Sequence, residues 1–174
     1  LFYSISFSNI HYYLNKILST RFQDRRKDIG SSFIITFYSS VALYIFLGFL
    51  LTLLNIDNDL RNLILVLNLI LITEPFSIFY SEIFVRGQFN RIFKIRFFQT
   101  LIFFTIKIIL VLKGYDLLFI ASAYVLENLF FSIIIIYYFK KNGNNFTNLI
   151  FNKKHTVNIL KKIILFPLMA FAII

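Results

Sequence analysis

Three ionisable residues stand inside long apolar stretches of the sequence: Glu74, Lys107 and Glu127. A charge at the centre of a membrane-spanning helix costs about 2.5–3.5 kcal/mol, so such residues normally face a protein interior or a wet cavity and serve ion or substrate movement. At a rise of about 1.5 Å per residue, both glutamates are expected about 16 Å into their helices from the same side. Lys107 is expected within reach of Glu127. We take these three as candidate substrate-binding or ion-coupling residues.

A structural alternative stays open for the same residues. Lys107 and Glu127 can form a buried packing pair, and Glu74 can bond to a hydroxyl of a neighbouring helix. Polar residues that we expect to share a hydrophilic cavity with them are Ser32, Thr36, Ser39, Ser40, Ser77, Ser81, Thr100, Tyr124 and Asn128. Pro75 removes a backbone hydrogen bond beside Glu74, which predicts a kink there.

Other chemistry is poorly represented. Arg86 and Arg91 are the candidates for contact with a diphosphate or with lipid head groups, since a guanidinium binds phosphate in bidentate fashion. The chain has no cysteine, and His11 and His155 are too far apart for a local metal motif. No catalytic grouping of Ser, His and Asp, or of paired carboxylates, is present. We therefore expect no enzyme activity, no metal and no cofactor.

The elements that must position these residues are membrane-spanning helices. The 174 residues are 59% hydrophobic and 15% charged, with a mean hydropathy of +0.78, whereas soluble domains are about 25% charged. Apolar stretches long enough to cross a hydrocarbon core of about 30 Å occur at 31–54, 63–80, 97–112 and 117–139, with a truncated fifth from 163 to 174. The prediction is an all-α integral membrane protein with a polytopic helical bundle.

The segments outside the bundle are expected to be a preceding helix end or interfacial segment at 1–30, and a basic loop at 140–162 that separates two lobes. Because the chain starts at Leu1 and ends on an apolar run, we interpret it as an internal piece of a longer transporter. The rest of that polypeptide, including a second lobe, would be its first partner.

The eighteen basic residues alternate with the predicted crossings. Five precede the first helix, four lie between the second and third, and six follow the fourth, while the two short loops between these hold one each and Lys107 lies within a helix. The positive-inside rule then places the N-terminal segment and the 81–96 and 140–162 loops in the cytoplasm. This distribution accounts for the net charge of +10 without a nucleic-acid partner.

The order of these features resembles the polysaccharide flippases of the multidrug/oligosaccharidyl-lipid/polysaccharide exporter superfamily. The segments that carry the resemblance are Arg25–Gly30 before a Ser-rich helix, Glu74–Phe76 with Tyr80–Glu82 and Arg86, Ile102–Lys113 with the Gly114 turn, Tyr137–Lys141, and Leu160–Ile163 with Phe166–Leu168. The likeness covers nearly the whole chain as a pattern of hydropathy and loops.

The resemblance implies a function in the bacterial cytoplasmic membrane. Such a protein would move undecaprenyl-diphosphate-linked oligosaccharide units across the membrane for O-antigen, lipopolysaccharide or capsule synthesis, by alternating access coupled to H+ or Na+. Its partners would be the lipid-linked oligosaccharide and membrane lipids. Two alternatives stay open: a multidrug or cation antiporter of the same superfamily, and a membrane enzyme such as a polysaccharide polymerase, which the minimal outer loops disfavour.

Overall fold

The computed structural model describes residues 14, 15, 18, 25–54, 56–142, 149, 156, 157 and 159. Within these residues the chain is helical and contains no strand. The helices are α2 (Arg25–Leu53), α3 (Asn58–Asn68), α4 (Ile70–Val85), α5 (Phe89–Leu112) and α6 (Leu117–Lys141). The predicted fifth span at 163–174, and nearly all of the predicted segments at 1–24 and 143–162, lie outside the described residues.

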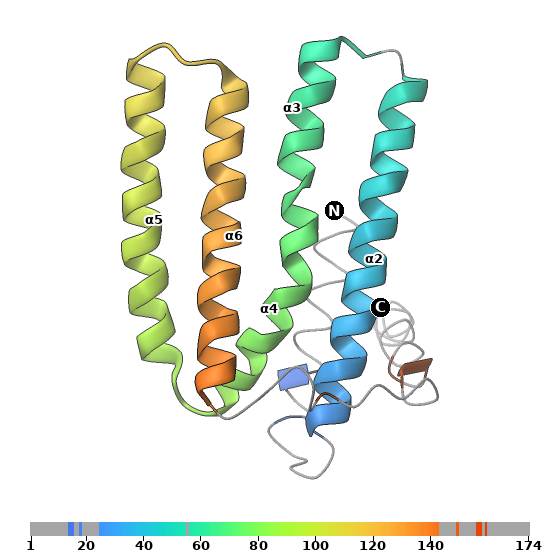
Figure 1. The fold of residues 1–174 in the computed structure, drawn as a ribbon, viewed down its shortest axis with the longest axis vertical. Coiled ribbons are helices and arrows are strands. Elements are labelled where there is room, and N and C mark those ends of the chain that lie inside the picture. Colours follow the sequence, from blue (N-terminus) through green and yellow to red (C-terminus); the bar gives the residue numbers. More distant parts are fainter. Residues whose placement is uncertain are drawn as a thin grey trace, which may run out of the picture.

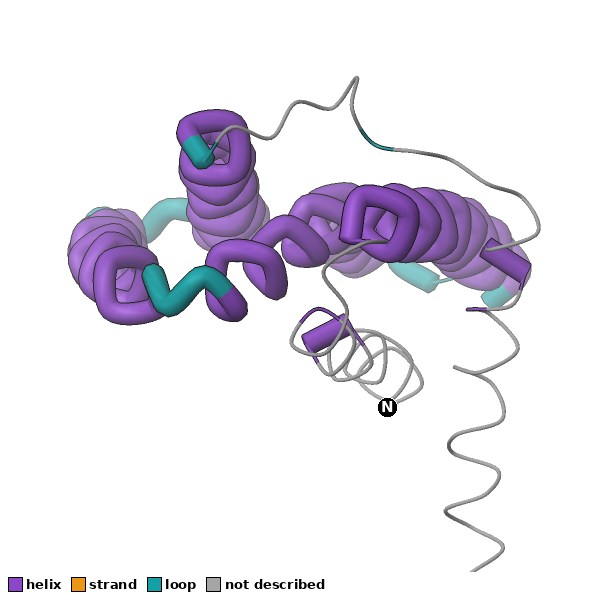
Figure 2. Tube along the Cα trace, turned by 90° about the horizontal axis from the view of Figure 1, so that it is seen from below, coloured by secondary structure: helices purple, strands orange, loops and turns teal. Residues whose placement is uncertain are grey.

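The described helices run up and down between two ends of a bundle (Figure 1). Two tight connections, α2 to α3 and α5 to α6, lie at one end, which we name the acidic end after Asp57, Asp59 and Asp116. The opposite end, where α4 turns into α5, holds Arg25 and Arg86, and we name it the basic end. Viewed along the helices, α5 lies at one side of the group, beyond α6 (Figure 2).

Four helical segments in the described part are long and apolar enough to cross a membrane: α2, α3 and α4 taken together, α5 and α6. Many large apolar side chains point outward from them, including Ile45 and Phe49 on α2 and Phe98 and Phe104 on α5. A soluble bundle would bury such residues, whereas lipid solvates them. The predicted class, a polytopic bundle of apolar helices, agrees with these four segments.

The helices at the basic end are longer than predicted. We expected helices from 31 and 97, but α2 begins at Arg25 and α5 begins at Phe89. The predicted loop over 81–96 is consequently only the connection from Arg86 to Gln88, with Gly87 at a φ of +73°. The sequence prediction takes the first charged residues as the end of a helix. Long basic side chains can, however, extend to water while their backbone stays helical, so the helices continue past these residues.

The second predicted span is broken near its middle. Leu69 separates α3 from α4, and the amides of Leu69 and Ile72 donate to carbonyls three residues earlier, at Val66 and Leu69, over 3.0 Å. These tight turns lie just before Leu71, whose carbonyl the ring of Pro75 would meet in a regular helix. The irregularity expected from Pro75 therefore occurs about one to two turns before the proline.

The interior of the bundle is centred on α4. Its residues Ile78, Phe79 and Ile83 have no exposed surface and belong to a cluster with apolar residues of α2 and α6. The Phe79 and Phe139 rings lie 4.4 Å apart between centroids. Because α4 packs on α2 at one side and on α6 at the other, it holds the two hairpins together, and α5 packs chiefly on α6.

Candidate functional site

The predicted pair between Lys107 and Glu127 is present. The Lys107 ammonium donates to Glu127 Oε2 over 2.7 Å, which joins α5 to α6 within their apolar segments. Glu127 is 3% exposed, and the Lys107 amine also lies 5.0 Å from the centre of the Tyr124 ring. A carboxylate so deeply buried requires a partner for its charge, and this lysine supplies it.

The ion pair is one part of a longer polar contact between α5 and α6, which we name the α5–α6 seam. The Gln99 amide donates to the Glu127 carbonyl, and Arg96 Nη2 lies 3.5 Å from Asn128 Oδ1. These α5 residues recur at intervals of three and eight, so they share one helix face, which is turned toward α6. The seam thus combines Arg96, Gln99 and Lys107 of α5 with Glu127 and Asn128 of α6.

Arg96 borders a pocket at the inner side of the seam. Its guanidinium carbon lies 4.2 Å from the centre of the Phe131 ring, and its Nη1 atom is buried without a hydrogen-bond partner. Among the described residues Arg96 has no ion-pair partner. The pocket holds about 360 Å³ and is lined by Asn15, Ser77, Tyr80, Ile92, Phe93, Arg96, Phe131 and Ile135. A cation, hydroxyl groups and aromatic walls suit an anionic group attached to a less polar body.

Glu74 makes no hydrogen bond or ion pair with Lys107 or Glu127 in the described part of the chain. It is partly buried, and the described contacts of its carboxylate are limited to Ser77 on the same helix, at 3.4 Å from Oε2. The Ser77 hydroxyl also donates to the Glu74 carbonyl over 2.6 Å. Because Ser77 lines the Arg96 pocket, Glu74 adjoins that pocket through one shared neighbour.

Of the four α2 residues predicted to line a hydrophilic cavity, Ser39 is partly exposed and the other three are fully buried. Ser32, Thr36 and Ser40 have no exposed surface, and α2 packs mainly on α4. The Thr36 hydroxyl donates to the Ser32 carbonyl over 2.7 Å within its own helix. Small hydroxyl side chains allow two helices to approach closely, so here they serve packing.

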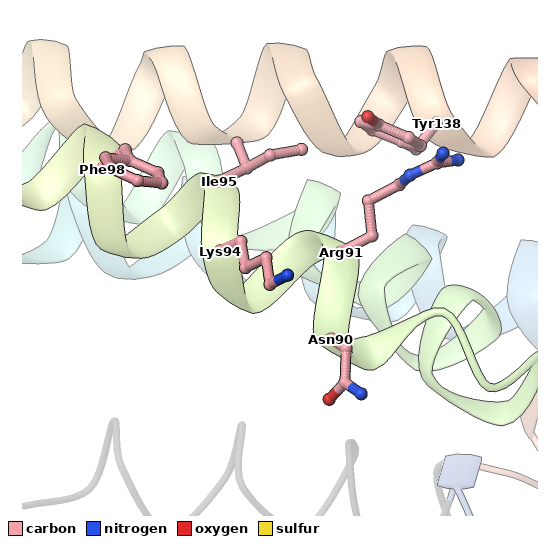
Figure 3. Close-up of a pocket in the computed structure, with 6 residues that line it drawn as sticks. All are labelled: Asn90, Arg91, Lys94, Ile95, Phe98 and Tyr138. Atoms are coloured by element: carbon pink, nitrogen blue, oxygen red, sulfur yellow. The ribbon is translucent and has the colours of Figure 1, made fainter.

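The two arginines proposed to contact phosphate have different surroundings. Arg86 Nε donates to Glu82 over 2.7 Å and its Nη1 donates to the Asn142 carbonyl over 3.2 Å, so this side chain already holds protein groups. Glu82 is 2% exposed and lies 3.8 Å from Arg25 as well. Arg91 is exposed and lines a separate groove on the outside of α5 (Figure 3). Of these two arginines, Arg91 is the one whose guanidinium makes no hydrogen bond or ion pair with a described protein group.

The sequence prediction gives no site role to Glu82, Arg96 or Gln99, because it expects a loop over 81–96 and an apolar span around Gln99. A usable signal was present for each. Glu82 and Arg86 stand at an i,i+4 spacing that favours a helical ion pair. The three-residue step from Arg96 to Gln99 puts both on the helix face that carries Lys107 once the helix is extended back to Phe89.

Comparisons with protein-family models, with curated proteins and with solved structures gave no match. Within the described residues, no group of three or more His, Asp or Glu side chains is placed to hold a metal ion. The α5–α6 seam and the Arg96 pocket are the features of the described residues that bear on function.

Proposed function

We propose that this chain is part of a membrane transporter that moves an amphiphilic anion, a lipid-linked oligosaccharide carrying a diphosphate, across the bacterial cytoplasmic membrane. The observation that carries the proposal is the buried Lys107–Glu127 pair within helices that are otherwise apolar. Replacing a buried ion pair with apolar residues is often neutral or stabilising, so packing alone does not require it. Ionisable groups inside such helices most often serve the passage of ions or substrates.

The Arg96 pocket supports an anionic substrate. Its buried guanidinium nitrogen has no hydrogen-bond partner, so a phosphate oxygen there would satisfy a donor that the described protein groups leave unpaired. The hydroxyl-bearing residues Ser77 and Tyr80 and the Phe93 ring supply polar and apolar contacts around it. In this proposal Arg96 binds the charged group, while Glu127 and Glu74 are the sites where an ion gradient acts on the helices.

Exchange of the buried charges tests the coupling role. Glu127→Gln and Glu74→Gln are each expected to lower export of surface polysaccharide at least tenfold with unchanged amounts of protein in the membrane, because an amide cannot take up and release a proton. Asp59→Asn, which removes an exposed acid at the acidic end, is the matched control and should leave export unchanged.

A charge swap separates coupling from packing. The double variant Lys107→Glu/Glu127→Lys keeps an ion pair but moves the carboxylate to α5. If the swapped double variant exports as much polysaccharide as the natural protein, the pair is structural and the coupling role is refuted. Full export from both single glutamate variants would refute it as well.

Orientation forms the second part of the proposal: the basic end faces the cytoplasm, in line with the alternation of basic residues. The natural chain contains no cysteine, so single cysteines introduced at Asp57 and Lys141 give unambiguous labelling sites. A membrane-impermeant thiol reagent added outside is expected to label the cysteine at 57 and not the one at 141. The reverse result, or labelling of both, would contradict this orientation.

A further inference from the structure

A second basic site lies on the outside of the α5–α6 hairpin, near the basic end. Its groove holds about 450 Å³ and is lined by Asn90, Arg91, Lys94, Ile95 and Phe98 of α5 and by Tyr138 of α6. Figure 3 shows the Arg91 side chain reaching toward Tyr138, with Lys94 and Asn90 projecting away from α6. We name this feature the outer groove.

The outer groove is distinct from the Arg96 pocket because the two use different faces of α5. A helix turns about 100° per residue, so Arg91, Lys94 and Phe98 share one face, while Arg96 lies roughly 120° or more around the helix from them. The two linings have no residue in common. One helix therefore presents basic groups both toward the bundle interior and toward its surroundings.

The charge of the outer groove is uncompensated. Arg91 and Lys94 are both exposed, and neither forms an ion pair or a side-chain hydrogen bond within the described part of the chain. No acidic residue lines the groove. Two adjacent cations without a carboxylate form a site for a group with negative charge, and the planar fork of Arg91 suits a phosphate.

The surroundings of the outer groove are apolar on the side that continues along α5. Phe98 is 62% exposed, and its neighbour Phe97 and the residues Leu101 and Ile102 farther along α5 are each more than half exposed. Tyr138 presents an aromatic ring with a polar tip, the type of side chain that settles at the boundary of a bilayer. A ligand that fits both parts has an anionic head and apolar chains.

We propose that the outer groove binds the phosphate of an anionic phospholipid from the leaflet at the basic end, with the acyl chains lying along the exposed face of α5. Basic pockets beside membrane helices select such head groups, with about fivefold in affinity expected for each basic residue near the surface. This inference rests on membrane insertion of the helices and does not depend on what the protein transports.

The natural sequence contains no tryptophan, which makes a local test direct. The full chain with Phe98→Trp, reconstituted in vesicles, carries its only tryptophan in the outer groove. Lipids brominated on their acyl chains quench that fluorescence on contact. Brominated phosphatidylglycerol is expected to compete for the site at least fivefold better than brominated phosphatidylcholine.

Variants within this background assign the preference to the groove. Arg91→Gln with Lys94→Gln should bring the preference for phosphatidylglycerol close to one. Arg26→Gln removes an exposed arginine at the same end of α2 and should leave the preference intact. Phe104→Trp, which reports on an exposed position farther along α5, should show nearly equal quenching by both lipids.

The outcomes separate this inference from the insertion on which it rests. Absence of quenching by either lipid would mean that α5 does not contact acyl chains, which would refute insertion. Quenching of equal strength by both lipids would leave insertion standing and overturn the lipid site. Loss of the preference on addition of millimolar inorganic phosphate, at constant ionic strength, would assign the groove to a soluble phosphate and also overturn the proposal.

Discussion

The α2–α4 interface and the α5–α6 hairpin are built from the same kind of apolar helix but are held together by different means. Between α2 and α4 the contact includes the Phe33 ring, 5.8 and 5.3 Å from the Phe76 and Phe79 rings, with the buried Ser40 seven residues later on the same face of α2. Between α5 and α6 the charged and amide groups of the α5–α6 seam make the hydrogen bonds, beside an aromatic contact between Phe103 and Phe130, whose ring centroids are 6.3 Å apart. On α5 itself only Ile92 and Gln99 are buried.

This difference shows two ways in which apolar helices can be held together. In lipid no hydrophobic force draws apolar helices together, so association depends on close van der Waals packing or on polar groups that hydrogen-bond across the interface. The α2–α4 interface uses the first and the α5–α6 seam the second. A contact made by packing depends on shape, whereas the α5–α6 contact also depends on the charges of Lys107 and Glu127, and it is the contact that holds α5, which packs chiefly on α6.

The largest effect is expected from breaking the seam on one side only. Lys107→Leu leaves Glu127 buried without its counter-ion, which should lower the free energy of unfolding by about 3 kcal/mol. The double variant Lys107→Leu/Glu127→Leu removes both charges and should recover most of that loss. Unfolding by a denaturing detergent in mixed micelles, followed by circular dichroism for all four members of the mutant cycle, measures both quantities.

That cycle also shows whether Lys107 and Glu127 stabilise the hairpin as a pair. Losses that add up in the double variant, with no recovery, would mean that the two side chains act independently. The α5–α6 hairpin would then be held by its short connection and by packing, like its neighbour.

A smaller loss is expected from enlarging a side chain in the packed interface. Ser40 has no exposed surface and shares the helix face of Phe33, which contacts Phe76 and Phe79 of α4. Ser40→Leu must therefore push α2 away from α4 and should lower the free energy of unfolding by about 2 kcal/mol, as overpacking of a tight core does. Tyr38→Leu lies on the same helix at a position that is 68% exposed and should change stability little. The same detergent unfolding measures the stability of both variants. Equal free energies of unfolding would show that the α2–α4 interface accommodates a larger side chain without strain.

How far the sequence could predict this structure differs between the two regions. The four long apolar helical segments of the described residues, the α5–α6 turn at 113–116 and the Lys107–Glu127 pair follow from hydropathy, loop length and depth along a helix, all of which are local quantities. The role of the α2 hydroxyl groups depends on whether that face meets water or another helix, and one sequence does not contain this information.

The basic end is the hardest part to predict, because charged residues occur there both within the helix ends and in the connections, so hydropathy does not distinguish the two. Glu82 was expected in a loop, yet it is buried between Arg25 and Arg86, which come from different helices. Its burial depends on the meeting of the α2 start with the α4 end, a tertiary contact. Helix ends set by such contacts are not encoded in the apolar run that identifies the span.

The smallest change in the free energy of unfolding is expected at the contact between the α4–α5 connection and the end of α6. Gln88, in the connection after α4, exchanges two side-chain hydrogen bonds with Asn142 at the end of α6, over 3.2 and 3.1 Å. Because both groups lie near the surface and water can replace either one, Gln88→Ala should cost about 0.6 kcal/mol, the usual size of a polar contact between membrane helices. Hydrogen exchange should nevertheless be faster in the last turn of α6 and unchanged around Glu127. Faster exchange along the whole of α6 would instead mean that this end controls the α5–α6 seam, so that the two regions open together rather than separately.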